Sequence, residues 1–174
     1  MHLSKKQKTI KYLIYCFVIV ISALLQNVDG LWFDLATARC YFLIPVSVIL
    51  GIDEDEKTAA LLGLFAGLLW DAVSAQHMGL NSIFLMIVCY LSSSLVTFLL
   101  RSTFWVKVIS SVAAVFLYSV IYWLIGVVFK SSENSLMMFS LYYLPSAIYT
   151  SIMSVLLCLV LSPLKRKLGT QEDL

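Results

Sequence analysis

Three polar residues interrupt a long apolar stretch and are the first candidates for chemistry. The segment GLLWDAVSAQHMGLNSIF, residues 67–84, places Asp71, His77 and Asn81 between two apolar runs. A carboxylate, an imidazole and an amide that lie close together can bind a ligand or move a proton. A lone histidine beside an apolar run is also common as a plain loop residue, so both interpretations of His77 stay open. Their role depends on the elements that hold them.

The composition indicates a protein that lies in a membrane. Of its 174 residues, 61% are hydrophobic and 13% are charged, whereas soluble domains are roughly 45–50% apolar. Helices of about 17–25 apolar residues cross a bilayer core of roughly 30 Å. We therefore predict an all-α integral membrane protein, a compact bundle of six transmembrane helices forming a single polytopic domain over residues 1–174. The expected spans are 12–28, 35–52, 58–73, 79–100, 104–129 and 141–162, and Pro163 is expected to end the last one.

The distribution of Lys and Arg predicts the orientation of these spans. Cytoplasmic loops of membrane proteins carry an excess of basic residues. If both termini are cytoplasmic, ten of the twelve basic residues lie on that side, and Arg39 and Lys130 are the exceptions. The acidic run DEDE, residues 53–56, then lies on the same side, which does not conflict with the rule because acidic residues contribute little to it.

Small residues recur every four positions in the expected third span. Ala59, Gly63, Gly67 and Asp71 lie above one another on one side of the helix, and residues 63–67 form a GxxxG motif. Such a strip lets a second helix backbone approach closely within a membrane. The second helix can belong to this chain or to a partner, and both interpretations stay open. Gly79, at the start of the fourth span, allows a tight reversal of the chain.

Asp71 lies at membrane depth, where a carboxylate usually has a partner. If the second span descends and the third rises from a cytoplasmic turn, Arg39 and Asp71 both stand roughly 20 Å above that turn. We therefore predict an ion pair between Arg39 and Asp71. The alternative is that each side chain reaches the interface separately. Asn81 is expected to cap the fourth helix or to hydrogen-bond another helix.

Motifs for catalysis and for cofactor binding are missing from the sequence. It contains no HExxH, P-loop or Ser-His-Asp pattern, and its four cysteines have no metal-ligand spacing. Serines in the fourth and fifth spans are expected to bond backbone carbonyls. We predict a protein that is not an enzyme, has no catalytic residues, cofactor or metal, and does not bind nucleic acid.

One stretch carries a family resemblance. The segment GLFAGLLWDAVSAQHMGLNSIFLMIVCYL resembles the rod shape-determining protein MreD family, in which a Gly-rich third helix is followed by an Asp, a short loop, Gly-Leu and a long apolar helix. The matching positions are Gly63, Gly67, Asp71, Ser74, Gly79, Leu80, Asn81 and Tyr90.

The resemblance implies a non-enzymatic scaffold in the cytoplasmic membrane of a bacterium, with several passes through the lipid bilayer. Its implied partners are MreC, a single-span protein, the MreB cytoskeleton, and the RodA glycosyltransferase with its transpeptidase. Such a scaffold helps couple the cytoskeleton to peptidoglycan synthesis during cell-wall elongation. We expect the third and fourth spans to contact MreC, because they carry small and polar residues beyond what lipid exposure requires.

A different function stays open. The substrate-binding S components of energy-coupling-factor vitamin transporters are also six-helix proteins of this size, and the MreD resemblance implies an S-component-like architecture. In that case Asp71, His77, Asn81 and Arg39 would line a vitamin pocket. The first span, however, lacks the AxxxA pattern that resembles their docking site.

Overall fold

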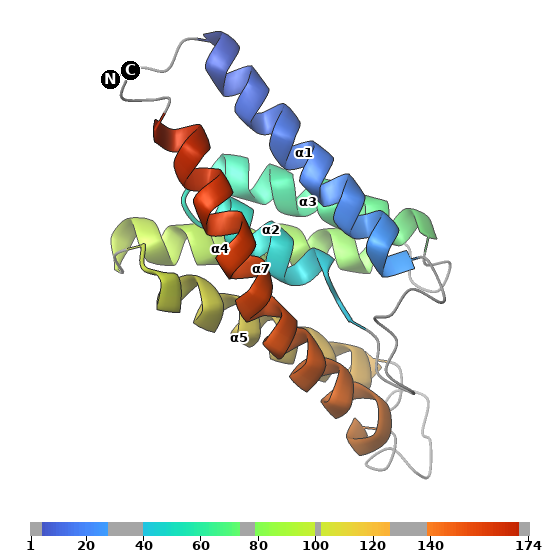
Figure 1. Ribbon diagram of the computed structural model, residues 1–174. Coiled ribbons are helices and arrows are strands. Elements are labelled where there is room, and N and C mark those ends of the chain that lie inside the picture. Colours follow the sequence, from blue (N-terminus) through green and yellow to red (C-terminus); the bar gives the residue numbers. More distant parts are fainter. Residues whose placement is uncertain (1–4, 28–39, 74–78, 100–101, 126–138, 171–174) are drawn as a thin grey trace.

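All the regular structure that we describe is helical. The computed structural model describes residues 5–27, 40–73, 79–99, 102–125 and 139–170. The elements are α1 (Lys5–Asn27), α2 (Leu43–Gly51), α3 (Glu56–Val73), α4 (Leu80–Phe98), α5 (Phe104–Trp123), the π-helical turn η2 (Phe139–Tyr143) and α7 (Leu144–Thr170) (Figure 1). The predicted all-α class is confirmed.

Four of these helical segments are long and apolar enough to cross a membrane. They are Gln7–Asn27, Leu80–Phe98, Phe104–Trp123 and Phe139–Lys165, and they correspond to the expected first, fourth, fifth and sixth spans. Their outward faces carry exposed apolar side chains such as Phe17, Leu91 and Leu156. These faces suit contact with lipid, because the side chains exposed on them are mainly apolar.

The prediction that the second span is a continuous helix from residue 35 was wrong. Residues 40–42 are not helical, and α2 has only nine residues, which is about 14 Å at 1.5 Å per residue and less than half a bilayer core. Pro45 lies in its first turn, where the missing N–H group is tolerated. Residues 35–39 lie outside the described part of the chain.

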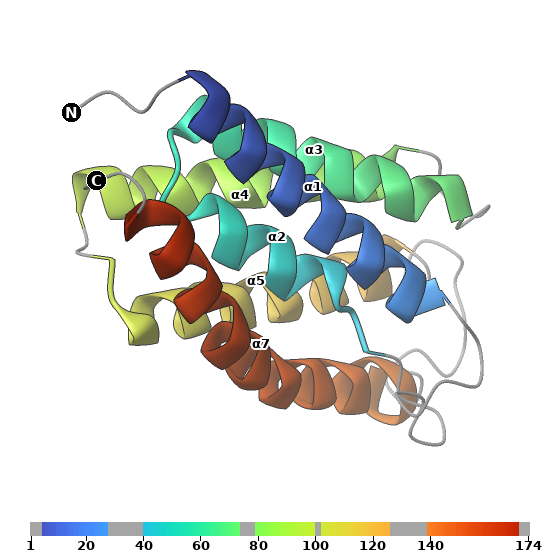
Figure 2. The same cartoon turned by 45° about the horizontal axis from the view of Figure 1, so that its top comes forward.

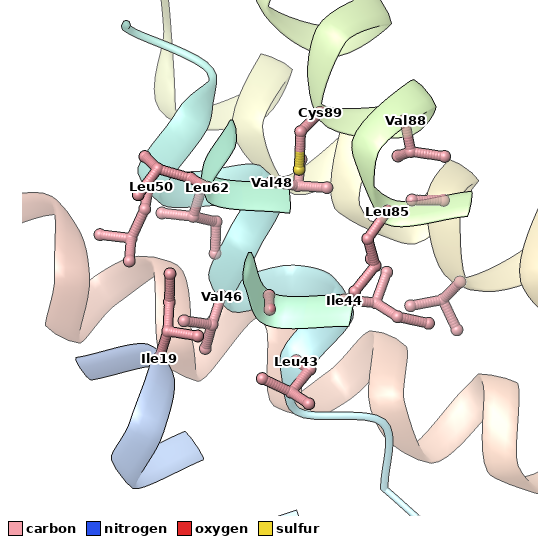
Figure 3. Close-up of a cluster of buried hydrophobic side chains, with 14 of the residues drawn as sticks. Ile19, Leu43, Ile44, Val46, Val48, Leu50, Leu62, Leu85, Val88 and Cys89 are labelled. Carbon is pink, nitrogen blue, oxygen red and sulfur yellow. The ribbon is translucent and has the colours of Figure 1, made fainter. Parts of the chain in front are cut away.

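The short helix α2 occupies the centre of the bundle. All nine of its residues are buried, and it contacts α1, α3, α4, α5 and α7 (Figures 1 and 2). Figure 3 shows its side chains meeting those of its neighbours, among them Ile19 of α1, Leu62 of α3 and Leu85 of α4. A helix that is apolar on every side is expected in such a position.

The two glycines of the GxxxG motif bring α3 directly against α4. A Cβ atom added to Gly67 would lie 2.3 Å from the Ser82 Cα atom, and one added to Gly63 would lie 2.4 Å from the Leu85 carbonyl oxygen. Both distances are too short for any real contact, so only glycine fits at these positions. Ala59, one turn earlier on the strip, is fully buried beside Gly51 of α2. The small-residue strip therefore packs within this chain.

Pro163 does not end the last helix, contrary to the prediction. Helix α7 continues through Pro163 to Thr170, although proline has no N–H group for the carbonyl of Leu159. Figure 2 shows that the ribbon of α7 bends between its orange N-terminal half and its red C-terminal half. The turns beyond Pro163 are held because Lys165 is hydrogen-bonded to the carbonyls of Ile49 and Leu50 in α2.

We expect Gly67→Ala to lower the free energy of unfolding by about 1–3 kcal/mol, because the added methyl group forces α3 and α4 apart. Thermal unfolding of the purified protein in detergent would measure this change. Gly51→Ala is the matched control, since its Cβ atom would lie 3.3 Å from the Ala59 Cβ atom, where a small shift suffices. Equal melting temperatures for the two variants would contradict the close approach of α3 and α4.

Candidate functional site

Polar side chains gather where the C-terminal end of α3 meets the N-terminal end of α4. The Asp71 side chain, in a residue only 7% exposed, accepts hydrogen bonds from the backbone N–H groups of Asn81 at 3.3 Å and Ser82 at 3.0 Å. The Ser82 hydroxyl donates to the same carboxylate. Gly79 precedes the helix with φ of 92°, a left-handed conformation that glycine adopts without strain. Asp71 thus caps α4 from a different helix.

Asn81 extends this cluster to α5. Its side-chain oxygen accepts hydrogen bonds from the hydroxyl groups of Tyr118 at 3.2 Å and Tyr122 at 2.9 Å, and the residue is 1% exposed. The Trp70 ring of α3 stacks on Tyr118 with 5.0 Å between the ring centroids. We call Asp71, Asn81, Ser82, Tyr118 and Tyr122 the polar junction. It ties α3, α4 and α5 together near one end of the bundle.

The predicted partner of Asp71 lies outside the described residues. Arg39 and His77 both fall in segments that the structure does not describe, so the Arg39–Asp71 pair stays a prediction. What the structure adds is a second role for the carboxylate. Its two oxygens lie at the positive end of the α4 helix dipole, where a negative charge is stabilising.

A second cluster of charges surrounds the turn between α2 and α3, at the opposite end of α3. One Asp53 oxygen accepts hydrogen bonds from the ammonium groups of Lys107 and Lys165, each at 2.7 Å. Its other oxygen accepts from the Ser102 hydroxyl. These contacts join the turn to the start of α5 and to the last turns of α7.

Lys165 also completes the C-terminal end of α2. Its ammonium group donates to the carbonyl oxygens of Ile49 at 2.8 Å and Leu50 at 3.0 Å. The last carbonyl groups of a helix have no partner within it. Because α2 ends inside the bundle, a side chain from another helix supplies the missing donors. At the other end of α2, the Gln26 side chain accepts from the N–H group of Leu43 at 2.9 Å.

The neighbouring Glu54 binds α1 and α4 to the same turn. Its carboxylate pairs with the Lys11 ammonium group at 2.8 Å and accepts from the Tyr15 hydroxyl at 3.2 Å. Its backbone carbonyl accepts from the Ser93 hydroxyl at 2.5 Å. We call Asp53, Glu54 and the three lysines that pair with them, Lys11, Lys107 and Lys165, the ionic cluster. Together with Ser93 it connects α1, α4, α5 and α7 to one turn.

The surroundings of Asp53 favour its charged form. Burial by itself raises the pKa of this carboxyl group, but the ammonium groups of Lys165 and Lys107 and the Ser102 hydroxyl lower it to about 2 from the usual 3.8. The residue lies at the surface, yet its side chain is only 26% exposed because the lysines cover the carboxylate. Asp53 is therefore ionised at any physiological pH.

The geometry of both clusters serves helix packing. Within the described ranges, no group of three or more His, Cys, Asp or Glu side chains is placed to hold a metal ion. Every buried side-chain nitrogen or oxygen in the same ranges has a hydrogen-bond partner. Serines of α5 bond their own helix, as Ser111 does to the Lys107 carbonyl and Ser119 to the Val115 carbonyl. The described polar groups hold helices together.

Sequence reasoning missed the ionic cluster and three of the five residues of the polar junction, Ser82, Tyr118 and Tyr122. The sequence places the run DEDE, residues 53–56, on the side of the membrane where ten of the twelve basic residues are expected. Acidic and basic residues expected on the same side of the membrane are the signal from which these ion pairs could have been predicted. Tyr118 and Tyr122 lie in an apolar span and carry no sequence signal that separates them from other interior aromatic residues.

Comparison with known families decides what kind of protein this is. The family model described as rod shape-determining protein MreD matches residues 6–168 of the 174-residue chain. The chain belongs to the MreD family. As a member of MreD, it is a rod shape-determining membrane protein, in a family of structural proteins that is not a known enzyme family. The matched region includes the polar junction and the ionic cluster.

The other two comparisons add no relative. No curated protein and no solved structure matches the chain. The expected likeness to S components of vitamin transporters therefore finds no support. In the structure, the carboxylate of Asp71 binds the start of α4 and the amide oxygen of Asn81 binds two tyrosines, so these groups serve packing in this MreD chain.

We expect Asp71→Asn to destabilise the protein by about 1–2 kcal/mol, because a neutral amide can no longer accept from both α4 N–H groups as an anion does. Hydrogen exchange of the Asn81 and Ser82 amides should become faster, and mass spectrometry of short peptides would measure it. Arg39→Gln is the informative comparison. If Arg39→Gln has the full effect of Asp71→Asn, the ion pair and not the helix cap is the dominant interaction.

A second prediction concerns acid stability. The pKa of Asp53 is lower in the folded protein than the usual 3.8, so its ionisation stabilises the fold above about pH 4. This stabilisation is lost as the pH falls towards 2. Solvent screening of a surface carboxylate limits the contribution to about 1 kcal/mol.

Unfolding measured in detergent between pH 5 and pH 2 would check this expectation. Asp53→Asn should lower stability at pH 5 and have a smaller effect at pH 2. The exposed Asp55, in the same acidic run, gives the matched control Asp55→Asn. A constant difference between wild type and Asp53→Asn over this range would contradict the expectation.

Proposed function

We propose that this MreD-family protein is a non-enzymatic scaffold of the cell-wall elongation complex in the bacterial cytoplasmic membrane. The observation that carries the proposal is the family match over residues 6–168. In this role the protein binds an MreC-like single-span protein. Through it, the protein helps couple the MreB cytoskeleton to the RodA-type glycosyltransferase and its transpeptidase.

The proposal includes a topology of six passes with both termini in the cytoplasm. The ionic cluster supports it, because Lys11, Lys107 and Lys165 meet at one turn. These three residues come from segments that the positive-inside rule assigns to the cytoplasmic side. The four long apolar helices supply the clearest passes. In the proposed arrangement α2 and α3 form a hairpin whose turn, with the ionic cluster, faces the cytoplasm.

We propose that MreC contacts the outward face of α3. The Gly63 and Gly67 side of this helix is occupied by α4, so a partner must use the opposite side, where Leu61 and Leu68 are exposed. Helix α3 begins with charged residues, carries Asp71 near its end and is not among the four long apolar segments. Such a helix is less suited to bare lipid than its neighbours, and a partner helix would cover it.

Purification of the tagged protein from its native membrane in mild detergent, followed by mass spectrometry, tests this function. We expect recovery of an MreC-like protein and of wall synthases. The double variant Leu61→Trp with Leu68→Trp should reduce that recovery at least fivefold, because two bulky rings on the contact face prevent close helix packing.

The matched control places the same ring on another exposed face. Ile152→Trp with Leu159→Trp changes two exposed residues of α7, spaced as Leu61 and Leu68 are, and should leave recovery unchanged. If both double variants reduce the recovery of the MreC-like protein equally, α3 is not the contact face. Recovery of two ATPases with a coupling membrane subunit, and no MreC-like protein, would overturn the scaffold function.

A further inference from the structure

The end of α7 extends beyond what a membrane pass requires. Helix α7 has 27 residues, about 40 Å at 1.5 Å per residue, whereas a bilayer core is roughly 30 Å thick. We call residues 164–170 the α7 tip. The tip carries Lys165, Arg166 and Lys167, and basic residues are expected at the cytoplasmic boundary.

Pro163 makes the start of the tip a natural point of bending. A proline inside a helix removes the hydrogen bond to the carbonyl four residues earlier, here that of Leu159, and its ring crowds the same carbonyl. Sharp changes of direction in helices occur mostly at such positions. The helix therefore resists bending less at Pro163 than elsewhere in α7, because one of the hydrogen bonds that cross this point is missing.

The Lys165 side chain ties the tip to the central helix α2. Lys165 is 8% exposed, and its three N–H groups meet three acceptors, the carbonyls of Ile49 and Leu50 and the carboxylate of Asp53. A buried ammonium group is stable only when it is paired and hydrogen-bonded in this way. All three acceptors belong to α2 or to the turn that follows it.

We propose that the α7 tip is a hinged latch, with Pro163 as the hinge and Lys165 as the catch that closes on the end of α2. Asp53 is still paired with Lys107 when Lys165 leaves, so the open state does not leave this carboxylate without a partner. Glu54 holds α1 through Lys11 independently. Because α2 contacts α1, α3, α4, α5 and α7, the position of the tip is transmitted to the whole bundle.

Distance measurement between two spin labels in lipid nanodiscs tests the latch. The labels are attached at Lys57→Cys, an exposed position at the start of α3, and at Gly169→Cys in the tip, with the four native cysteines replaced by alanine. In the labelled protein without further substitutions, we expect one main distance between the two spin labels. Lys165→Met should increase the population at longer distances at least fivefold, because the catch is lost.

Three further variants separate a hinged latch from a static anchor. Asp53→Asn is milder than Lys165→Met, since the Ile49 and Leu50 carbonyls still hold the lysine, and it should increase the same population at least twofold. If Lys165→Met does not fold, Asp53→Asn by itself tests whether the catch holds the tip. Asp55→Asn, at an exposed carboxylate, should change nothing. Pro163→Ala is then added to whichever folded variant has the largest population at longer distances. It should reduce that population at least twofold, because the N–H group of residue 163 can again donate to the Leu159 carbonyl.

Two results would overturn the latch. In the first, Lys165→Met and Asp53→Asn both keep the original distance, so the tip stays docked without the catch. In the second, Pro163→Ala leaves the open population unchanged, so the bending point is not Pro163. These outcomes concern only the conformation of the chain and do not depend on the proposed partners.

Discussion

Helix ends that lie inside a membrane-embedded bundle must find hydrogen-bond partners elsewhere in the chain, and this constraint organises the structure. Helix α2 is short, buried on all sides and in contact with α1, α3, α4, α5 and α7. Its first N–H groups and last carbonyls cannot reach water. Gln26 of α1 serves one end and Lys165 of α7 serves the other, so the central helix is stabilised only when the outer helices are in place.

The same solution appears at α4, where it is combined with close packing. Asp71 caps α4 across the interface with α3, and Gly67, one turn before it, leaves no room for a side chain against Ser82. The cap requires the two backbones to be close, and the glycine allows it. Packing and hydrogen bonding therefore fix the same register between the two helices, which explains why small residues and a carboxylate share one side of α3.

The ionic cluster gives this MreD-family chain a defined cytoplasmic end in the proposed topology. Two carboxylates of one turn bind lysines from α1, α5 and α7. The proposed scaffold function requires that the helices keep a fixed arrangement, so that partners on both sides of the membrane can be coupled through the protein. A turn that gathers the helix ends, with one helix attached through a proline hinge, provides both a fixed frame and one movable part.

The class of the protein can be assigned from the amino-acid sequence, because apolar content, the spacing of small residues and the positions of the lysines do not depend on the fold. These features predicted an all-α membrane protein, and the motif around Asp71 indicated the MreD family. Tertiary structure alone decided that α2 is short and central, that α7 passes through Pro163, and that Asp71 binds the backbone of α4. It also decided that Lys165 closes α2. The reason is physical: a helix end is satisfied by whichever side chain the fold brings to it, and Lys165 lies 116 residues from Ile49 in the chain.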